Sequence, residues 1–149
     1  MRIRDFVPSD ALRLVEILKA NQQYGHPELD GPEAMMRVHE CKAAEFLVAE
    51  EDFQVVGLIR GVYDGSRAII HIASVHPDYQ RRGIGRTLVA AIAKRFKERG
   101  ASSLAVTVPG EVDFWKKMGF RHTTRIMFAY PIDEVIRRTE RGARKAQEQ

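Results

Sequence analysis

The feature that most constrains the fold is a change of hydrophobic period near the middle of the chain. Three successive apolar runs rich in β-branched residues are separated by turn signals, among them Asp64-Gly65, and they lie at 46–49, 54–63 and 68–75. Such short connections join antiparallel neighbours, so these runs predict a meander. From Gly83 the apolar residues instead recur at helical spacing, and Gly100 ends the helix.

Shorter elements flank this centre on both sides. A strand is expected over 2–6, a helix from about Asp10 to Gln23, and a second helix from Pro32 to about Lys42, with a loop at 24–31 between the helices. After the long helix, the pattern predicts a strand at 103–108, a short helix at 111–118 and one or two strands at 120–130. A strand that returns to its sheet after a helix is normally parallel. The sequence therefore predicts an α/β (α+β) domain around one mixed, mostly antiparallel sheet.

Length and composition fit one globular domain. The chain has 149 residues, of which 44% are hydrophobic and 30% charged. We assign residues 1–130 to the domain and 131–149 to a charged C-terminal tail that is either helical or frayed. No apolar run is long enough to cross a bilayer, and the first ten residues lack the apolar centre of a signal peptide. We expect a cytoplasmic protein without membrane contact.

Net charge and cysteine content limit the kinds of ligand and cross-link that the chain can have. The formal net charge is +4, which suits a polyanionic small ligand or a nucleic acid. The basic run from Lys94 to Arg99 reads as a solvated helix face without interleaved aromatic residues, so a nucleic-acid partner is disfavoured. The single cysteine, Cys41, excludes an intramolecular disulfide, and no histidine or carboxylate set has metal-ligand spacing. No metal is expected.

The segment from Val75 to Thr87 carries the clearest chemical signal. A strand ends there, a turn follows, and two glycines, Gly83 and Gly85, open the long helix. Unpaired N–H groups and the helix dipole make such a terminus an anion site, and glycines allow close approach of phosphate oxygens. Spacing alone leaves a structural turn as the alternative. The pattern is neither a dinucleotide fingerprint nor a P-loop, because a third glycine and a Gly-Lys-Ser/Thr sequence are missing.

Several blocks together resemble a known family. Gln80-x-x-Gly83-x-Gly85, preceded by Val75-His76-Pro77, resembles the acetyl-coenzyme A signature of the GNAT (Gcn5-related N-acetyltransferase) superfamily. The segment 114–120, ending in Gly-Phe, resembles a second block of that family, and the hairpin at 47–57 also fits. Within the superfamily, the combination of 47–50 with 63–65 is similar to small prokaryotic members of the YpeA type.

The resemblance implies a fold, a cofactor and a set of binding residues. It implies a three-layer α/β/α domain whose sheet is splayed where acetyl-coenzyme A binds. Backbone around Ser74 and Val75 would pair with the pantetheine arm, and N–H groups from Arg81 to Arg86 would hold the pyrophosphate. The expected cofactor-binding residues are Ser74, Val75, Gln80, Arg81, Arg82, Gly83, Ile84, Gly85, Arg86, Thr87 and Trp115. An amine acceptor, small molecule or protein, is implied as the partner, and a homodimer is possible because members of the family are often dimers.

Three side chains are candidates for proton transfer and for contact with the amine substrate. The attacking amine must lose a proton, and His71 is our candidate base, because regular alternation would place it on one face with Ala73 and Val75. The alternative is a histidine that fills a half-buried sheet position. In the resemblance, the loop that holds Tyr24 and His26 borders the acceptor pocket, so these two side chains are expected to touch the substrate.

The sequence departs from the family at the leaving group. Many members have a tyrosine, which protonates the thiolate, where this chain has Trp115, and an indole is not a usable acid. Solvent, Tyr63 or Tyr130 would then supply the proton. The family's asparagine is missing from the link 108–114. Two functions follow: N-acetyl transfer in a direct ternary complex, or an acyl-coenzyme A-binding or sensor protein that transfers slowly or not at all. The acceptor's identity is left open.

Overall fold

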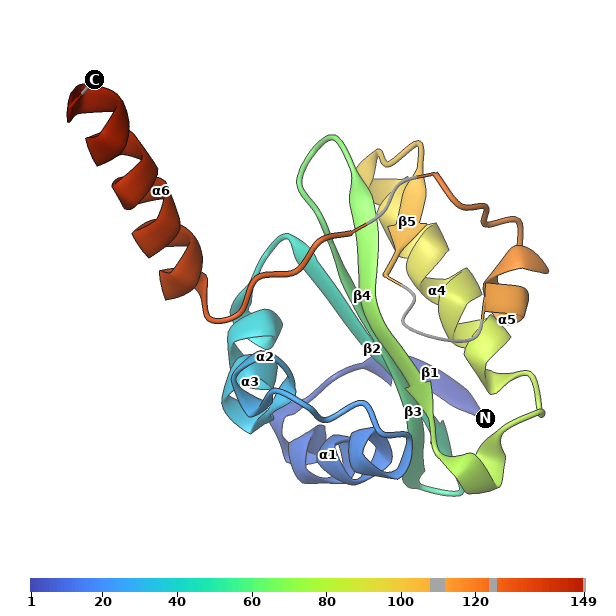
Figure 1. Ribbon diagram of the computed structural model, residues 1–149. Coiled ribbons are helices and arrows are strands. Elements are labelled where there is room, and N and C mark those ends of the chain that lie inside the picture. The colour runs from blue at the N-terminus through green and yellow to red at the C-terminus, as the bar shows by residue number, and fades with distance from the viewer. Residues whose placement is uncertain (108–111, 124–125, 149) are drawn as a thin grey trace.

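The computed structural model of the protein describes residues 1–107, 112–123 and 126–148. The described strands form one sheet in the order β1-β2-β3-β4-β5, in which only β4 and β5 run parallel (Figure 1). The strands are β1 (Arg2–Asp5), β2 (Ala44–Glu51), β3 (Gln54–Tyr63), β4 (Ala68–Val75) and β5 (Leu104–Val106). The predicted meander and the mixed, mostly antiparallel sheet are confirmed.

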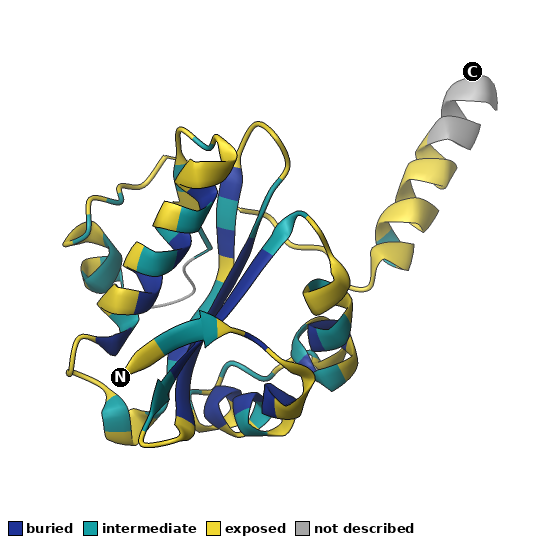
Figure 2. Cartoon of the chain, turned by 180° about the vertical axis from the view of Figure 1, so that it is seen from behind, coloured by how far each residue is buried: buried dark blue, intermediate teal, exposed yellow. Residues whose placement is uncertain are grey.

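Helices cover both faces of the sheet and make three layers. On one face lie α1 (Ala11–Ala20), α2 (Pro27–Asp30) and α3 (Pro32–Glu40), and on the other lie α4 (Ile84–Arg99) and α5 (Val112–Lys116). Short 3₁₀ turns, η1 (Pro8–Asp10) and η2 (Pro77–Tyr79), precede α1 and follow β4. The tail forms a helix, α6 (Ile132–Glu148), that projects away from the domain (Figures 1 and 2). In the part of the chain that is described, no helix has the length and apolar character needed to span a membrane.

Alternation along the strands divides the described core into two clusters. Leu47 and Ile59 face α4, where Leu88 and Phe96 complete the packing. The neighbouring strand residues Phe46, Val48 and Leu58 face the opposite layer, where they meet Leu14, Ile17 and Met35. All of these side chains are buried. Both faces of β2 and β3 are covered, so these two strands lie at the centre of the core (Figure 2).

Strand β4 changes register at its centre and then separates from β5. Arg60 of β3 pairs with Ile72, whereas the next residue, Gly61, pairs with Ile70, so His71 is the extra residue of a β-bulge. The pairing of β4 with β5 extends only from Ala68 to Ile70. Beyond Ile70, the edge of β4 that faces β5 has no strand partner among the described residues. The splayed sheet that the family resemblance implies is therefore present.

Two parts of the predicted element order were wrong. None of the described residues between 120 and 130 is in a strand, and Ile126, Met127 and Phe128 are 62%, 95% and 67% exposed. The alternation typical of a strand is there, but a strand needs a hydrogen-bonded neighbour, and this segment pairs with none of the described strands. The loop expected at 24–31 contains the one-turn helix α2.

Candidate cofactor and acceptor site

The N-terminus of α4 is built as an open anion site. Its N-cap residue is Gly83, with φ of 81°, and no side chain caps the helix. The amide and hydroxyl of Thr87 both donate to the Gly83 carbonyl, at 3.0 and 2.8 Å. The N–H groups of Ile84, Gly85 and Arg86 come before this first helical bond and have no partner inside the helix. A Cβ added to Gly83 would meet no atom of the described residues within 4 Å, so these residues leave the position beside the helix start open.

Three arginines surround this terminus. Arg81 has φ of 65° and Arg86 lies in the first turn of α4, and both side chains are exposed. The Arg82 guanidinium lies 5.1 Å from the centre of the Tyr79 ring and 3.8 Å from a carboxylate oxygen of Glu51. Positive charge and backbone donors therefore converge on one place, which is the arrangement that holds a phosphate or pyrophosphate.

The turn before α4 is held by a carboxamide network. Gln80 Nε2 donates to the Val75 carbonyl at 2.9 Å and to Asn21 Oδ1 at 3.1 Å. Asn21 Nδ2 in turn donates to Ser74 Oγ and to the Val75 carbonyl, both at 2.7 Å. Gln80 therefore positions the turn through its side chain. Asn21 was missed by the sequence analysis, and its only local signal was a polar amide directly after α1.

Gly85 serves the packing of α5. A Cβ at this position would lie 3.1 Å from the Phe114 ring and 3.8 Å from the Val75 side chain. Neighbouring Ile84 is 3% exposed and belongs to the core. Of the two glycines in the motif, Gly83 leaves space for a ligand, and Gly85 leaves space for an aromatic ring.

The free edge of β4 presents alternate residues. The His76 amide donates to the Val56 carbonyl, so residues 74 and 76 direct their backbone groups toward β3. Ala73 and Val75 consequently direct theirs toward the open edge, where Gln23 Nε2 reaches the Ala73 carbonyl at 3.3 Å. Ser74 faces β3 with its backbone, and its hydroxyl is bonded to Asn21. Of the two residues expected to pair with pantetheine, Val75 has the required orientation and Ser74 does not.

The expected face of His71 was wrong, because the bulge interrupts the alternation. Ile70 packs with the α4-side cluster and Ile72 with the α1-side cluster, although residues two apart share a face in a regular strand. The charges that act on the exposed His71 ring belong to Arg60 and Asp30, on the α1–α3 side. Desolvation and then the Arg60 charge lower the pKa of His71 below its ordinary 6.5. The imidazole is therefore neutral at pH 7 and able to accept a proton.

Arg60 is a buried charge beside this histidine. Its Nη2 donates to Asp30 Oδ1 at 2.7 Å and to the Leu29 carbonyl at 2.8 Å, and its guanidinium lies 5.7 Å from the centre of the Phe46 ring. The residue is 7% exposed, and its buried Nη1 has no hydrogen-bond partner among the residues that the structure describes. Burial lowers the pKa of Arg60, and Asp30 opposes this shift. The sequence signal, a lone arginine inside the apolar run 54–63, was overlooked.

Tyr24 and His26 lie in the connection between α1 and α2. Tyr24 lines a hollow of about 220 Å³ together with Lys19, Gln22 and Gly25. The His26 ring lies 4.4 Å from the ring of Tyr130 and 5.9 Å from that of Phe128. A hydrogen bond with Glu28 raises the pKa of Tyr130. The structure thus brings the segment 128–130 against the loop predicted to border the acceptor.

The candidate acids for the leaving group are separated in space. The Tyr63 hydroxyl donates to the Gly65 carbonyl at 3.0 Å, at the end of β3 remote from Gly83, which does not favour it as the acid. Trp115 meets Phe114 and Phe120 edge-to-face, with ring centres 5.2 and 5.4 Å apart. It is half-buried against the core. Part of the link that lacks asparagine, 108–111, lies outside the described residues.

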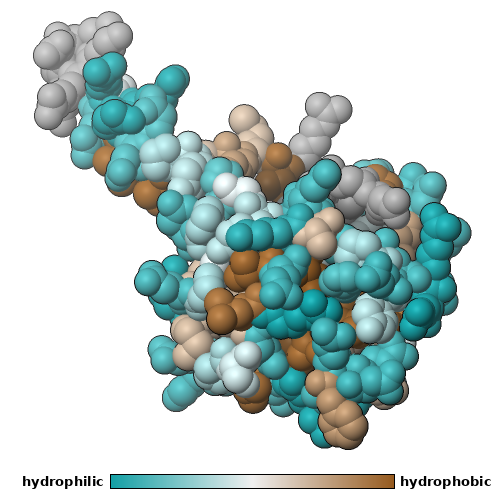
Figure 3. Space-filling view, turned by 90° about the horizontal axis from the view of Figure 1, so that it is seen from below, coloured by the Kyte–Doolittle hydropathy of each residue, from teal (hydrophilic) through white to brown (hydrophobic). Residues whose placement is uncertain are grey.

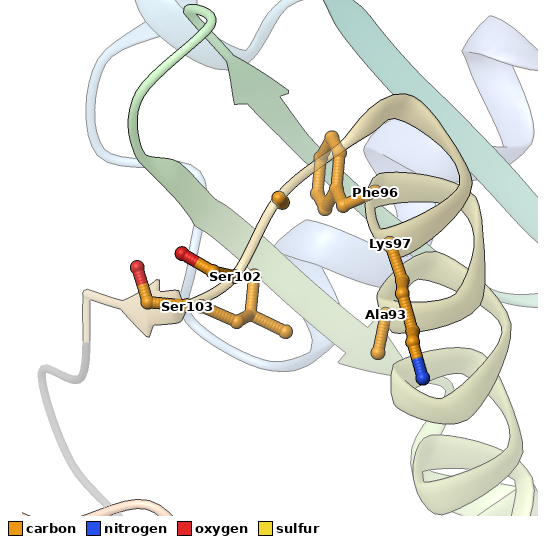
Figure 4. A pocket seen from close by; sticks show the side chains of 7 residues that line it. Ala93, Phe96, Lys97, Ser102 and Ser103 are labelled. Carbon is orange, nitrogen blue, oxygen red and sulfur yellow. The ribbon is translucent and has the colours of Figure 1, made fainter.

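A second hollow lies at the other end of α4. It has a volume of about 370 Å³ and is lined by residues from the end of α4 and the start of β5, among them Phe96, Lys97 and Ser103 (Figure 4). Phe96 is more than three helical turns beyond Gly83 along α4. This hollow is therefore separate from the anion site. Within the described ranges, no group of three or more histidine, cysteine, aspartate or glutamate residues could hold a metal ion.

Comparisons with known proteins agree with this geometry. A family model described as "Acetyltransferase (GNAT) family" matches residues 11–120. An acetyltransferase from Sodalis glossinidius is 43% identical over 68 residues, which cover 46% of this chain and 48% of that protein. The chain thus spans about half the length of the curated relatives it matches.

Solved structures match over most of the chain. A transcriptional regulator from Bacillus halodurans aligns with a TM-score of 0.74 and 24% identity, covering 87% of this chain and 98% of that one. The PaiA N-acetyltransferase of Thermoplasma acidophilum, solved in complex with coenzyme A, aligns with a TM-score of 0.69 and 20% identity, covering 80% and 89%. These likenesses show the fold, and the family match shows membership. The chain belongs to the GNAT acetyltransferase family.

Proposed function

We propose that this protein is an N-acetyltransferase that moves the acetyl group of acetyl-coenzyme A to a primary amine in a direct ternary complex. The observation that carries the proposal is the open, uncapped N-terminus of α4 next to the free edge of β4. Family membership supports it, as does the coenzyme A complex of the Thermoplasma N-acetyltransferase.

The residues around this terminus fit the cofactor. The N–H groups of Ile84, Gly85 and Arg86 would hold the pyrophosphate, and Arg81, Arg82 and Arg86 would neutralise its charge. The Ala73 and Val75 N–H groups at the β4 edge would donate to the pantetheine carbonyls, because the carbonyls of both residues already accept side-chain amides. Trp115, which stands on α5 next to Phe114, would close the α5 side of this path.

Proton transfer is assigned to His71. Acetyl-coenzyme A would supply an activated thioester: a bond from the amine nitrogen to its carbonyl carbon would form, and the bond from that carbon to sulfur would break, releasing the coenzyme A thiolate. His71 takes a proton from the incoming ammonium group, and Arg60 keeps the imidazole neutral by opposing its protonation. Because His71 lies on the α1–α3 side of β4, the acceptor would enter between this layer and the segment 126–130. Tyr24 and His26 would line that entry.

A weakly catalytic acyl-coenzyme A-binding protein is the second candidate. Trp115 favours it, because the ring is held in an aromatic cluster and offers no acidic proton to the departing thiolate. Tyr130 has a raised pKa, which makes it a poorer acid. In the transferase proposal, solvent therefore protonates the thiolate.

We also propose a subgroup, a cellular location and an oligomeric state for this protein. The blocks 47–50 and 63–65 support a place among the small prokaryotic members of the YpeA type. The proposed setting is the cytoplasm, where acetyl-coenzyme A and amine acceptors are both available, and the proposed assembly is a homodimer.

Initial rates with varied acetyl-coenzyme A and varied amine test the proposal. A panel of an N-terminal peptide, a lysine peptide, spermidine and an aminoglycoside covers the main acceptor classes. Double-reciprocal lines that intersect would support direct transfer in a ternary complex. Parallel lines would indicate a covalent acetyl-enzyme and contradict it. Tight acetyl-coenzyme A binding without turnover across the panel would favour the sensor.

A further inference from the structure

Three aromatic rings meet where the chain passes α2 on its way to α6 (Figure 1). The centre of the His26 ring lies 4.4 Å from that of Tyr130 and 5.9 Å from that of Phe128. The Phe128 and Tyr130 rings are parallel within 4°, with their centres 6.3 Å apart. We call these three rings the aromatic cluster. With these separations, one point can lie within about 6 Å of all three centres, which is the range over which a cation is attracted to an aromatic face.

The aromatic cluster is open to solvent. Phe128 and Tyr130 are 67% and 44% exposed, and Figure 3 shows hydrophobic side chains at the surface beside the base of α6. Aromatic pairs at such distances between ring centres attract one another, so the rings hold their positions although they are exposed. A ligand can therefore reach the cluster without displacing a buried side chain.

Glu28 adds a negative charge to the aromatic cluster. A hydrogen bond from its own backbone N–H, and then one from the Tyr130 hydroxyl, hold the pKa of Glu28 below its ordinary value. The carboxylate is therefore ionised at neutral pH, and it stands beside the Tyr130 ring. Aromatic faces attract a cation through their quadrupole, and a carboxylate attracts it through its charge. The combination suits an organic cation better than a neutral group.

The basic side chains around α2 are directed to other partners. Arg60 Nη2 is bonded to Asp30 and to the Leu29 carbonyl. Arg37 Nη2 donates to the main-chain carbonyl of Glu28 at 3.2 Å and not to its carboxylate. Among the residues that the structure describes, the Glu28 carboxylate forms no ion pair. It can therefore pair with a cationic ligand.

Helix α2 connects the aromatic cluster with His71. His26 is the N-cap residue of α2 and Asp30 is its last residue. The two ends of this helix are about 6 Å apart along its axis. The charge of Asp30 acts on His71. A short alkyl chain spans such a distance, so one acceptor can have its reacting amine beside His71 and a second group at the cluster.

We propose that the aromatic cluster and Glu28 bind a second, cationic group of the acceptor. The preferred substrates are then amines that carry an ammonium, guanidinium or quaternary ammonium group a few carbon atoms from the reacting nitrogen. This inference rests on the proposed transferase function and narrows its substrate class. A neutral amine of the same shape would keep the apolar contact with the rings but lose the attraction to their faces and to Glu28.

Two acceptors of the same shape test the inference on the full chain. One is an aminobutyl trimethylammonium salt, whose quaternary nitrogen cannot be acetylated. The other is its neutral analogue, which has a carbon atom in place of that nitrogen. Initial rates with acetyl-coenzyme A give kcat/KM for each acceptor, and the measured quantity is the ratio of the cationic to the neutral acceptor. Because both acceptors meet the same protein, a change in folding or in acetyl-coenzyme A affinity cancels in this ratio.

We expect the wild-type ratio to be at least about five. Glu28→Gln removes only a charge, and Phe128→Leu removes a ring but keeps an apolar side chain, so each should lower the ratio at least about twofold. Glu40→Gln removes an exposed carboxylate from the last residue of α3 and is the matched control, which should keep the wild-type ratio. A wild-type ratio near one, or a ratio that Glu28→Gln or Phe128→Leu leaves unchanged, would overturn the inference.

Failure of the transferase function would give a different result. In that case neither acceptor is acetylated, and calorimetric titration with the same two compounds decides whether the cluster is a cation site. Tighter binding of the cationic compound than of its neutral analogue, reduced in Glu28→Gln, would support the site. Equal affinities of the wild-type protein for the two compounds would overturn it.

Discussion

Gly83 is the N-cap residue of α4, and both its backbone conformation and the space beside it depend on the missing side chain. Its φ of 81° is a conformation that L side chains rarely adopt, and the position of its missing Cβ faces open space. An ordinary side chain there would stand in front of the α4 N–H groups. Glycine thus suits the turn and, in the proposed function, also the approach of the pyrophosphate.

Replacing Gly83 by valine should therefore weaken acetyl-coenzyme A binding by at least about tenfold, about 1.4 kcal/mol. The backbone strain would also destabilise the fold by roughly 1–2 kcal/mol. Gly65→Val is the matched control, because Gly65 also has positive φ and open space but lies in the β3–β4 turn, away from α4. Calorimetry and thermal melts should show similar destabilisation of both variants and reduced affinity only for Gly83→Val. Unchanged affinity in Gly83→Val would remove the pyrophosphate from this terminus.

His71 gives the second prediction at this scale. Its pKa is lowered, so in the wild type kcat/KM should fall on acidification only below about 6.5, as the imidazole protonates. His71→Ala should lose about 100-fold in kcat/KM at pH 7 and progressively less at alkaline pH, where more free amine is present. The exposed His122→Ala serves as control and should retain the wild-type profile. A His71→Ala profile parallel to wild type would exclude a role as base.

The bounds of strand β4 could be predicted from the sequence, but its bulge could not. Its bounds, 68–75, and the helix from Gly83 to Gly100 were predicted, because apolar period and terminal glycines are local signals. The bulge at His71 depends on how β3 and β4 pair around Gly61, whose Cβ would lie 2.2 Å from the Ile69 carbonyl oxygen. That close approach is a non-local contact, so regular alternation gave the wrong face for His71.

The failure at 120–130 has a related cause. Alternation predicts that a segment can be a strand, but it does not say which edge the segment joins. In this structure the partner of Tyr130 and Phe128 is His26, far away in sequence. Asn21 and Arg60 were missed for the same reason: each acts through residues about 30 to 50 positions away.

Helices α4 and α5 pack closely where Gly85 meets the Phe114 ring. A methyl group at Gly85 would lie 3.1 Å from the Phe114 ring, so Gly85→Ala should destabilise the domain by about 1–3 kcal/mol. Phe114→Leu removes the colliding ring atoms. In a double-mutant cycle, the Gly85→Ala penalty should therefore be smaller in the Phe114→Leu background. Additive penalties would mean that Gly85 has another role, such as direct contact with the cofactor.

At the scale of the whole molecule, the sheet separates two tasks. The α4 side provides the anion site, and the α1–α3 side holds His71, Arg60 and the loop with His26. The free edge of β4 lies between them, where β5 diverges. In the proposed function, a cofactor entering from one side and an amine from the other would meet at this edge, and the acetyl group would pass directly between them. Helix α6 projects away from this arrangement (Figure 1).

The most direct test of the central claim is a calorimetric titration of the wild-type protein with acetyl-coenzyme A, with ATP as the control for general phosphate binding. We expect micromolar affinity for acetyl-coenzyme A, about −8 kcal/mol, and much weaker binding of ATP. That result would join the α4 terminus and the β4 edge into one ligand site. Absence of acetyl-coenzyme A binding, or equal affinity for ATP, would rule out a specific acetyl-coenzyme A site at α4 and β4.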